Sequence, residues 1–376
     1  MTSDPEDPDD RADRTVSVDL ETLGWNQRFA EPFRPHAAEG LRPARVAVTH
    51  NYLYQLYTAS GDVMAEVAGR VRYRAAGADA MPVVGDWVAI RPGETNDKAT
   101  IEAVLPRHSC FSRKAAGEPT RRQVVAANID TVFLVCGLDE EFNLRRIERY
   151  LVAIRDSGAT TVIVLNKADV RADVNAARAA VTALAPDTPI HVLSCLEHGS
   201  TDVLKPHLGP GTTVALIGSS GVGKSTIINR LLGADRQRTR PIRSRDGRGR
   251  HTTTQRELIQ LPDGGLLIDT PGMRELQLWD ATASLDDAFE DIEALAAHCR
   301  FRDCAHDQEP GCSVRAAVDD GRLVASRFDN FRKLQSEGEL LRQRREELAR
   351  LEEQRRVTPE HRTMRSMRHN RLTDGK

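Results

Sequence analysis

The sequence predicts a multidomain protein with a small all-β part, a central α/β part and an α-helical C-terminal part. Three observations carry this prediction. The chain has 376 residues, which is too many for one ordinary core. Short alternating segments crowd the N-terminal third, and continuous apolar runs separated by amphipathic stretches follow them. Beyond Trp279 the strand-like runs end, and three cysteines gather between helical stretches.

The composition is that of a folded soluble protein, with 40% hydrophobic and 29% charged residues. No apolar run approaches the ~18–20 residues that span a bilayer. The acidic first ten residues are unlike a secretory signal. We therefore expect a cytoplasmic protein, a monomer with no membrane contact. The net charge of −2 hides a basic tail from Arg355 onward, which is either a solvated segment or a nucleic-acid contact.

Residues 1–40 are acidic and then mixed in composition, and we expect a partly ordered N-terminal arm. Residues 41–112 are predicted to form a small all-β barrel with no helix between its strands. Its expected strands are 45–50, 54–58, 62–69, 70–75, 85–90 and 98–105. Five or so short strands in about 60 residues suit an OB-type barrel, and a small SH3-like barrel would look the same.

Residues 120–280 are predicted to form a doubly wound α/β domain, because apolar runs alternate with amphipathic stretches. The expected strands are Thr131–Cys136, Thr161–Leu165, Ile190–Leu193, Thr213–Ile217 and Leu266–Ile268, and the expected helices are Leu144–Arg155, Val174–Leu184 and Ser225–Leu232. Residues 281–376 then carry helical stretches at Ser284–Ala297 and Arg332–Arg356.

A phosphate-binding loop follows the strand Thr213–Ile217 and opens a helix, as the motif G-x-x-x-x-G-K-S/T requires. It consists of Gly218, Ser219, Ser220, Gly221, Val222, Gly223, Lys224 and Ser225. The glycines let successive backbone N–H groups point at the β-phosphate. Lys224 is expected to neutralise β- and γ-phosphate oxygens, Ser225 to bind Mg²⁺, and Thr226 to approach the α-phosphate.

The base-recognition motif is Asn166-Lys167-Ala168-Asp169, at the carboxyl end of a predicted strand. The Asp169 carboxylate can accept hydrogen bonds from guanine N1–H and the 2-amino group. Adenine lacks both donors, a mismatch worth ~10⁴-fold or more. Lys167 would lie along the base and Asn166 would brace the loop. Ser194 and Cys195 follow the predicted strand Ile190–Leu193, and we expect a backbone N–H there to approach guanine O6. The alternative is that these two residues form an ordinary turn with no contact to the base.

A second phosphate-sensing segment is Asp269-Thr270-Pro271-Gly272. Asp269 would hold Mg²⁺ through water, and the Gly272 N–H would contact the γ-phosphate. The next residue is Met273, where many GTPases use Gln to orient the attacking water. The loop 247–254 (GRGRHTTT) supplies candidates instead: His251 for positioning the water and Thr253 for completing the Mg²⁺ shell. The alternatives for His251 are a solvent-facing residue and a contact with RNA.

Motif order distinguishes this chain from ordinary GTPases, because the base motif precedes the phosphate-binding loop. The nucleotide domain is therefore circularly permuted, and it ends just after the segment that senses the γ-phosphate. The C-terminal domain is attached directly to that segment.

A cysteine cluster follows, made of Cys299, Cys304, His306 and Cys312. Three thiolates and one imidazole suit a closed, structural Zn²⁺ site, with a tight turn at Pro310-Gly311. A short segment has little core of its own, so metal binding could contribute ~10 kcal/mol or more to its folding. The alternative is three buried free cysteines.

Together these features resemble the ribosome small subunit-dependent GTPase A family. The resemblance also includes residues 84–88 (VGDWV) and 123–130 (QVVAANID), and it covers most of residues 41–335. It implies an OB-fold, a permuted GTPase domain and a zinc domain, with weak GTP hydrolysis that the small ribosomal subunit stimulates. It also implies contact with rRNA, a role in that subunit's late maturation, and His251 as the hydrolysis residue. The chain departs from the family in its longer N-terminal arm and in Ser194-Cys195, where Ser-Ala is commoner.

Two other functions fit parts of the sequence. Met273 in place of Gln would suit a passive RNA-binding protein that uses GTP as a structural ligand. A phosphate-binding loop alone would suit an ATP-dependent enzyme, but Asn166-Lys167-Ala168-Asp169 argues against it.

Overall fold

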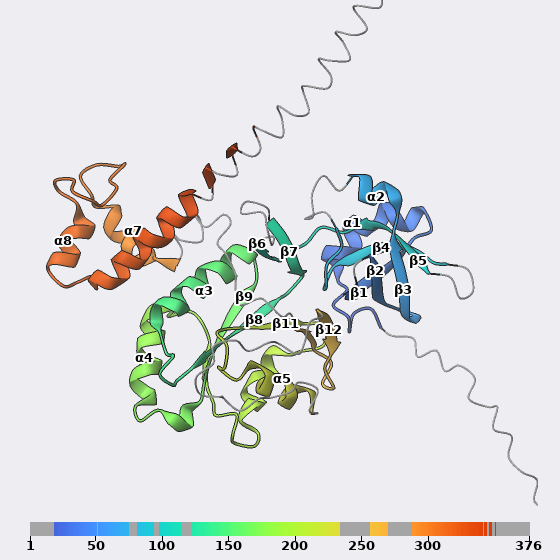
Figure 1. Ribbon diagram of the computed structural model, residues 1–376, viewed down its shortest axis with the longest axis horizontal. Coiled ribbons are helices and arrows are strands. Elements are labelled where there is room, and N and C mark those ends of the chain that lie inside the picture. The colour runs from blue at the N-terminus through green and yellow to red at the C-terminus, as the bar shows by residue number, and fades with distance from the viewer. Residues whose placement is uncertain are drawn as a thin grey trace, which may run out of the picture.

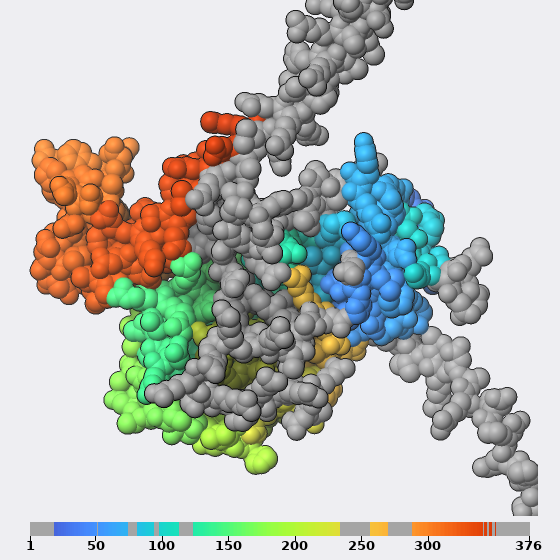
Figure 2. All heavy atoms as spheres, in the orientation of Figure 1, coloured from blue at the N-terminus to red at the C-terminus, as the bar shows by residue number. Residues whose placement is uncertain are grey.

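The computed structural model describes residues 19–50, 52–74, 81–93, 98–114, 122–233, 256–269 and 288–340, with residues 342, 343, 346, 347 and 350. An N-terminal barrel, a central α/β domain and a C-terminal helical domain follow one another along the chain (Figure 1). The barrel and the helical domain lie on opposite sides of the central domain, and Figure 2 shows the same arrangement. Among the described residues, no helix has both the length and the apolar character needed to cross a bilayer.

The barrel closes on itself, as the alternating strands predicted. Its strands are β1 (Arg42–His50), β2 (Leu53–Thr58), β3 (Gly61–Val67), β4 (Trp87–Arg91) and β5 (Ala99–Val104). They hydrogen-bond in the order β1-β2-β3-β5-β4, and β4 pairs back with β1. Inward-facing residues such as Val46, Leu56, Ala65 and Ile101 are fully buried and form its core.

One predicted strand of the barrel is wrong. Residues 70–75 were expected to extend, but Gly69–Arg74 form a short helix, α2, between β3 and β4. The alternation of Val71 and Tyr73 with arginines imitates a strand. Only Val71 packs against the barrel core, whereas the Tyr73 side chain is exposed. The expectation that no helix interrupts the strands is therefore also wrong.

A helix that the sequence did not predict, α1 (Gln27–Ala38), lies in the N-terminal arm. The Asn26 side chain caps it by accepting a hydrogen bond from the Arg28 N–H at 3.0 Å. Its buried Phe29 and Phe33 pack with Trp25 against Trp87 of the barrel. The described part of the arm is thus an integral part of the barrel.

The central sheet has the order β10-β9-β8-β11-β13-β12. Its strands are β8 (Thr131–Gly137), β9 (Thr160–Asn166), β10 (Ile190–Val192), β11 (Thr213–Ile217), β12 (Glu257–Gln260) and β13 (Leu266–Asp269). Its helices are α3 (Leu144–Ser157), α4 (Val174–Leu184) and α5 (Lys224–Leu232), with 3-10 helices at Ala168–Val170 and Ser200–His207. All the predicted strands and helices of this domain are present. The antiparallel edge strand β12 was not predicted; it pairs with β13 and touches β1 of the barrel at Val48.

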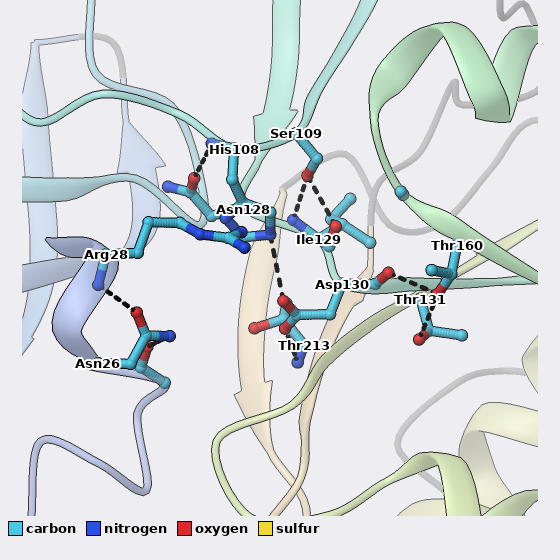
Figure 3. Close-up of polar contacts among 12 residues, drawn as sticks. Asn26, Arg28, His108, Ser109, Asn128, Ile129, Asp130, Thr131, Thr160 and Thr213 are labelled. Carbon is cyan, nitrogen blue, oxygen red and sulfur yellow. Dashed lines mark hydrogen bonds and ion pairs between the residues drawn. The ribbon is translucent and has the colours of Figure 1, made fainter.

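A two-stranded ribbon joins the barrel to the central domain. It consists of β6 (Cys110–Lys114) and β7 (Arg122–Ala127). Ser109 lies just before β6 and Ile129 just after β7; the Ser109 hydroxyl donates to the Ile129 carbonyl and accepts from the Ile129 N–H, both at 2.7 Å (Figure 3). These bonds tie the start of the ribbon to its end.

A buried arginine anchors this junction. The Arg45 guanidinium of β1 donates to the carbonyls of Leu23, Gly85 and Asn128 and to the Thr213 hydroxyl of β11. Complete burial lowers the pKa of Arg45 to about 10, so it stays charged at neutral pH. Asp130 lies close by and accepts a hydrogen bond from the Thr213 N–H at 2.8 Å (Figure 3). The arm, the barrel and the central sheet therefore share one buried polar network.

The C-terminal domain contains α7 (Glu290–Ala296), α8 (Ser313–Asp319) and a helix over residues 325–340. The sequence placed the start of this last helix seven residues later. Phe289, Ile292, Val314, Phe331 and Leu334 are all buried and form the apolar core of these helices. The rings of Phe289 and Phe331 meet edge to face at 5.3 Å.

Candidate nucleotide site and metal cluster

The phosphate-binding loop lies between β11 and α5, as the motif requires. Gly218 and Gly223 both have positive φ angles, of 147° and 101°. A Cβ atom at Gly218 would lie 2.1 Å from the Val135 carbonyl oxygen, and one at Gly223 would lie 2.1 Å from Asn166 Nδ2. Glycine is therefore required at these two positions by close packing as well as by backbone conformation.

Lys224 begins α5, and its Nζ donates to the carbonyls of Gly218 and Ser219 at 2.7 and 2.6 Å. The ammonium thus sits over the loop that would surround the phosphates. Ser225 and Thr226 follow in the first turn of α5, and both are partly exposed.

The base motif reaches the phosphate-binding loop through Asn166, at the end of β9. Its Nδ2 donates to the Val222 carbonyl at 2.8 Å, and its Oδ1 accepts from the Cys195 N–H at 3.1 Å. Asn166 is 1% exposed, so these two bonds satisfy an otherwise costly buried amide. One side chain therefore links three loops of the site, consistent with the bracing expected of it.

Asp169 is exposed and accepts a 2.5 Å hydrogen bond from the Ser194 hydroxyl. Ser194 in turn accepts from the Leu196 N–H at 3.2 Å. Lys167 has a left-handed φ of 64°, and its Nζ pairs with Asp139 at 2.5 Å. The structure thus brings Ser194 to the base motif, and the Asp169 side chain stays accessible to a ligand.

Cys195 is a packing residue of this loop. Burial raises the pKa of its thiol to about 11, so the thiol stays protonated at neutral pH. It then behaves as a small apolar side chain that packs in the loop.

Asp269 ends β13, and β13 pairs in parallel with β11. The carboxyl ends of parallel neighbours meet at one sheet edge, so Asp269 and Ser225 both belong to the edge that carries the phosphate-binding loop. A carboxylate and a hydroxyl are oxygen ligands of the kind that Mg²⁺ prefers. The other predicted residues of this region, His251, Thr253, Gly272 and Met273, lie outside the described residues.

The cysteine cluster comes together as predicted: one ligand atom from each of Cys299, Cys304, His306 and Cys312 lies within 4.8 Å of the others. The sulfurs of Cys299 and Cys312 are 3.9 Å apart, and His306 Nδ1 lies 3.6 and 3.4 Å from them. Zn–S bonds of ~2.3 Å in a tetrahedron require sulfurs about 3.8 Å apart. The donor set and its spacing therefore fit one Zn²⁺ ion.

The loop between Cys304 and Cys312 is held in shape by Glu309. Its carboxylate accepts hydrogen bonds from the N–H groups of Ala305, Asp307 and Gln308. Backbone hydrogen bonds of this kind lower the pKa of Glu309. The turn at Gly311, with a φ of 79°, brings its carbonyl to the Arg300 N–H.

Several site residues were missed by the sequence analysis. Asp139 pairs with Lys167, Arg230 donates to the Cys195 carbonyl, and Arg146 donates to the Ser219 hydroxyl. Asp139 follows the carboxyl end of β8, at the sheet edge that also bears the motifs. This position after a predicted strand is the sequence feature that could have identified Asp139. Arg146 and Arg230 lie within helices, and no motif marks them.

The fold and the site together define a circularly permuted P-loop GTPase: a guanine-type base motif after β9, followed later in the chain by a phosphate-binding loop after β11. A family model described as RsgA GTPase matches residues 104–279. A protein of Opitutus terrae named small ribosomal subunit biogenesis GTPase RsgA is 50% identical over 327 residues, covering 85% of this chain and 89% of that protein. The protein of that name from Syntrophotalea carbinolica is 43% identical, with 85% and 90% covered.

Solved structures agree with these relatives. YjeQ from Thermotoga maritima matches with a TM-score of 0.59 at 26% identity, over 79% of this chain and 98% of that chain. YloQ, described as a circularly permuted GTPase, matches with a TM-score of 0.57 at 22% identity, over 80% and 95% of the chains, and supports the fold alone. The chain belongs to the RsgA GTPase family, and it is a GTP-hydrolysing enzyme.

Proposed function

We propose that this protein is a GTPase that binds the small (30S) ribosomal subunit and assists its late maturation, hydrolysing GTP to GDP and phosphate faster when bound. The observation that carries the proposal is the 50% identity, over most of both chains, to a small ribosomal subunit biogenesis GTPase. The protein would act in the cytoplasm as a monomer.

In the reaction, Asp169 and the Ser194 loop select guanine, while Asn166, Lys167 and Ala168 shape its pocket. The N–H groups of residues 218–223 and the Lys224 ammonium bind the phosphates, and Thr226 contacts the α-phosphate. Ser225 and Thr253 would ligate magnesium, with Asp269 acting through water; bound Mg²⁺ would neutralise phosphate charge.

His251 is the proposed catalytic residue, positioning the attacking water, and the Gly272 N–H would contact the γ-phosphate. The proposal for His251 is supported by Met273, which has no donor to orient a water molecule. It is supported as well by the position of His251 in the sequence, between the phosphate-binding loop and Asp269.

Two surfaces are proposed to contact rRNA. The order of the barrel strands, with α2 between β3 and β4, supports an OB-type barrel, a fold that binds oligonucleotides on its strands and loops. On this barrel the Arg72 guanidinium lies over the exposed Tyr52 ring, 4.8 Å from the ring centroid, and Tyr73 is 93% exposed. Aromatic and arginine side chains of this kind stack on bases. The basic tail from Arg355 is the second surface, and it lies outside the described residues.

GTP turnover with and without purified small subunits, at two salt concentrations, tests this function. We expect the subunit to raise the rate, and we expect the stimulation to fall steeply at higher salt because basic side chains would displace counterions from RNA. A rate that small subunits do not change would contradict the ribosome assignment.

A His251→Ala variant separates catalysis from passive binding. Loss of a water-positioning group should slow turnover by about 10²-fold or more while leaving GTP affinity nearly unchanged. His198→Ala, at an exposed histidine outside the motifs, is the matched control. Unchanged turnover in His251→Ala would favour the passive RNA-binding protein, and tighter binding of ATP than of GTP would favour an ATP-dependent enzyme.

A further inference from the structure

Arg146 of α3 touches the phosphate-binding loop from outside the known motifs. Its Nη1 donates to the Ser219 hydroxyl at 2.9 Å and pairs with Glu141 at 3.1 Å. It lies beside a recess between α3 and the loop that Cys136, Phe142 and Val222 also line. A charged donor therefore holds the second residue of the phosphate-binding loop from the side.

Ser219 is the residue through which this contact can affect the phosphates. Its carbonyl, together with that of Gly218, accepts hydrogen bonds from the Lys224 ammonium. When a nucleotide binds, Lys224 must turn from these carbonyls to the phosphate oxygens. A contact that sets the orientation of Ser219 therefore sets how Lys224 is presented, and the Arg146 charge adds attraction for the anionic ligand.

The C-terminal domain packs against the same helix, α3. Glu148, which is 6% exposed, accepts hydrogen bonds from Arg327 at 2.6 Å and from Asn330 at 2.5 Å. Arg327 also pairs with Asp291 at 2.7 Å. One residue before Arg146, the Arg145 side chain donates to the Ser326 carbonyl.

A more exposed pair lies one turn along α3, where Arg149 pairs with Glu337 at 3.0 Å. In Figures 1 and 2 the helix that bears residues 325–340 lies against α3. Residues 145–149 thus contact the C-terminal domain on one side and the phosphate-binding loop on the other.

We propose that Arg146 is a positioning residue for nucleotide binding and that α3 transmits the docking of the C-terminal domain to the phosphate-binding loop through it. This route requires only the nucleotide-binding activity, and it is separate from the covalent link through residues 270–287. Movement of the C-terminal domain on a partner would shift residues 145–149 and so alter the hold on Ser219.

The first test is a double-mutant cycle between Arg146→Ala and Ser219→Ala, read as dissociation constants for fluorescent GDP and GTP analogues. We expect Arg146→Ala to weaken both nucleotides about threefold to tenfold, as loss of one charged hydrogen bond allows. The KM for GTP should rise by a similar factor with kcat changed less. Ser219→Ala combined with Arg146→Ala should cost little more than either change alone.

Arg146→Lys, which keeps a cationic donor, should restore part of the affinity. Arg155→Ala, at an exposed residue of the same helix, is the matched control. Wild-type affinities in Arg146→Ala would overturn the proposal. Fully multiplicative effects in the cycle would overturn it too, because Arg146 would then act without Ser219.

The second test places a change in the C-terminal domain. Arg327→Ala should weaken binding of both GDP and GTP, as Arg146→Ala does. In a chain that already carries Arg146→Ala, the further loss of affinity caused by Arg327→Ala should be smaller than in the wild type. Because Arg327→Ala leaves Glu148 buried without its cation, Glu337→Ala provides a milder variant, and circular dichroism checks folding of both. If both leave nucleotide affinity unchanged, or if their effects multiply fully with that of Arg146→Ala, transmission through α3 is overturned.

Discussion

At the scale of single residues, the nucleotide site depends on side chains that satisfy backbone groups of neighbouring loops. Asn166 does this for Val222 and Cys195, and the space it occupies exists because residue 223 has no side chain. Asp169, in contrast, meets only the Ser194 hydroxyl among the contacts of the described chain and faces solvent. Bracing and the proposed base recognition therefore fall on two different residues of one motif.

Base selectivity should follow the chemistry of residue 169. In Asp169→Asn an amide replaces the carboxylate, so one of the two acceptors for guanine N1–H and the 2-amino group becomes a donor. We expect GTP affinity to fall about 10²-fold or more and xanthosine triphosphate, which presents an oxygen at that position, to bind better than GTP.

Competition binding with both nucleotides measures this preference. Asp187→Asn, at an exposed residue after α4, should bind GTP as the wild type does. Retained preference for GTP in Asp169→Asn would mean that another group reads the base.

At the scale of elements, the cysteine cluster connects α7 to α8. Cys299 follows α7, and Cys312 caps α8, its Sγ accepting from the Arg315 N–H at 3.4 Å. The two helices also share a buried core with Phe331 of the following helix. Apolar packing therefore holds these helices together, and a metal ion bound at the cluster would add to it.

Metal removal should loosen this domain while leaving the central sheet folded. We expect one zinc per chain by elemental analysis and a lower thermal midpoint with Cys312→Ser, because three ligands hold the ion less well than four. Serine is itself a good helix cap, so a lower thermal midpoint would reflect weaker metal binding and not the loss of the cap of α8.

Cys110→Ala, at a cysteine outside the cluster, serves as the control and should keep its zinc. If Cys312→Ser retained both its metal and its thermal midpoint, the cluster would be a group of buried thiols.

At the scale of the whole molecule, the two flanking domains attach to the central domain in different ways. The barrel shares the buried Arg45 network and the short β1–β12 contact. The C-terminal domain docks on α3 through the buried Glu148 and its partners. Because β11 carries Thr213 at its start and the phosphate-binding loop after its end, the barrel is joined to the strand that leads into the site.

Loss of the Arg45 cation should uncouple the barrel from the central domain. Arg45→Met leaves three carbonyls and the Thr213 hydroxyl without their donor in a buried site, and we expect a loss of about 3 kcal/mol in the free energy of unfolding. Calorimetry should then resolve a separate, earlier transition for the barrel.

Arg42→Met, at an exposed residue of the same strand, should unfold as the wild type does. A single unshifted transition in Arg45→Met would show that apolar packing around Trp87 suffices to hold the domains together.

The sequence by itself determined the class of this protein, because the motifs and the strand runs are local patterns. Gly218–Ser225, Asn166–Asp169 and the cysteine cluster each need only a few neighbouring residues to specify their chemistry. The buried strands of the central domain could also be predicted from the sequence, since parallel strands covered on both faces are apolar throughout.

Only the tertiary structure decided the contacts between segments far apart in the chain. Residues 70–75 have a strand-like alternation, yet Gly69–Arg74 form α2, with Val71 against the barrel core and Tyr73 exposed. Arg45, Arg146 and Glu148 look like ordinary surface charges in the sequence. Each has a role only because folding brings a partner beside it, from another domain for Arg45 and Glu148 and from the phosphate-binding loop for Arg146. The identity of such partners depends on packing that no local pattern encodes.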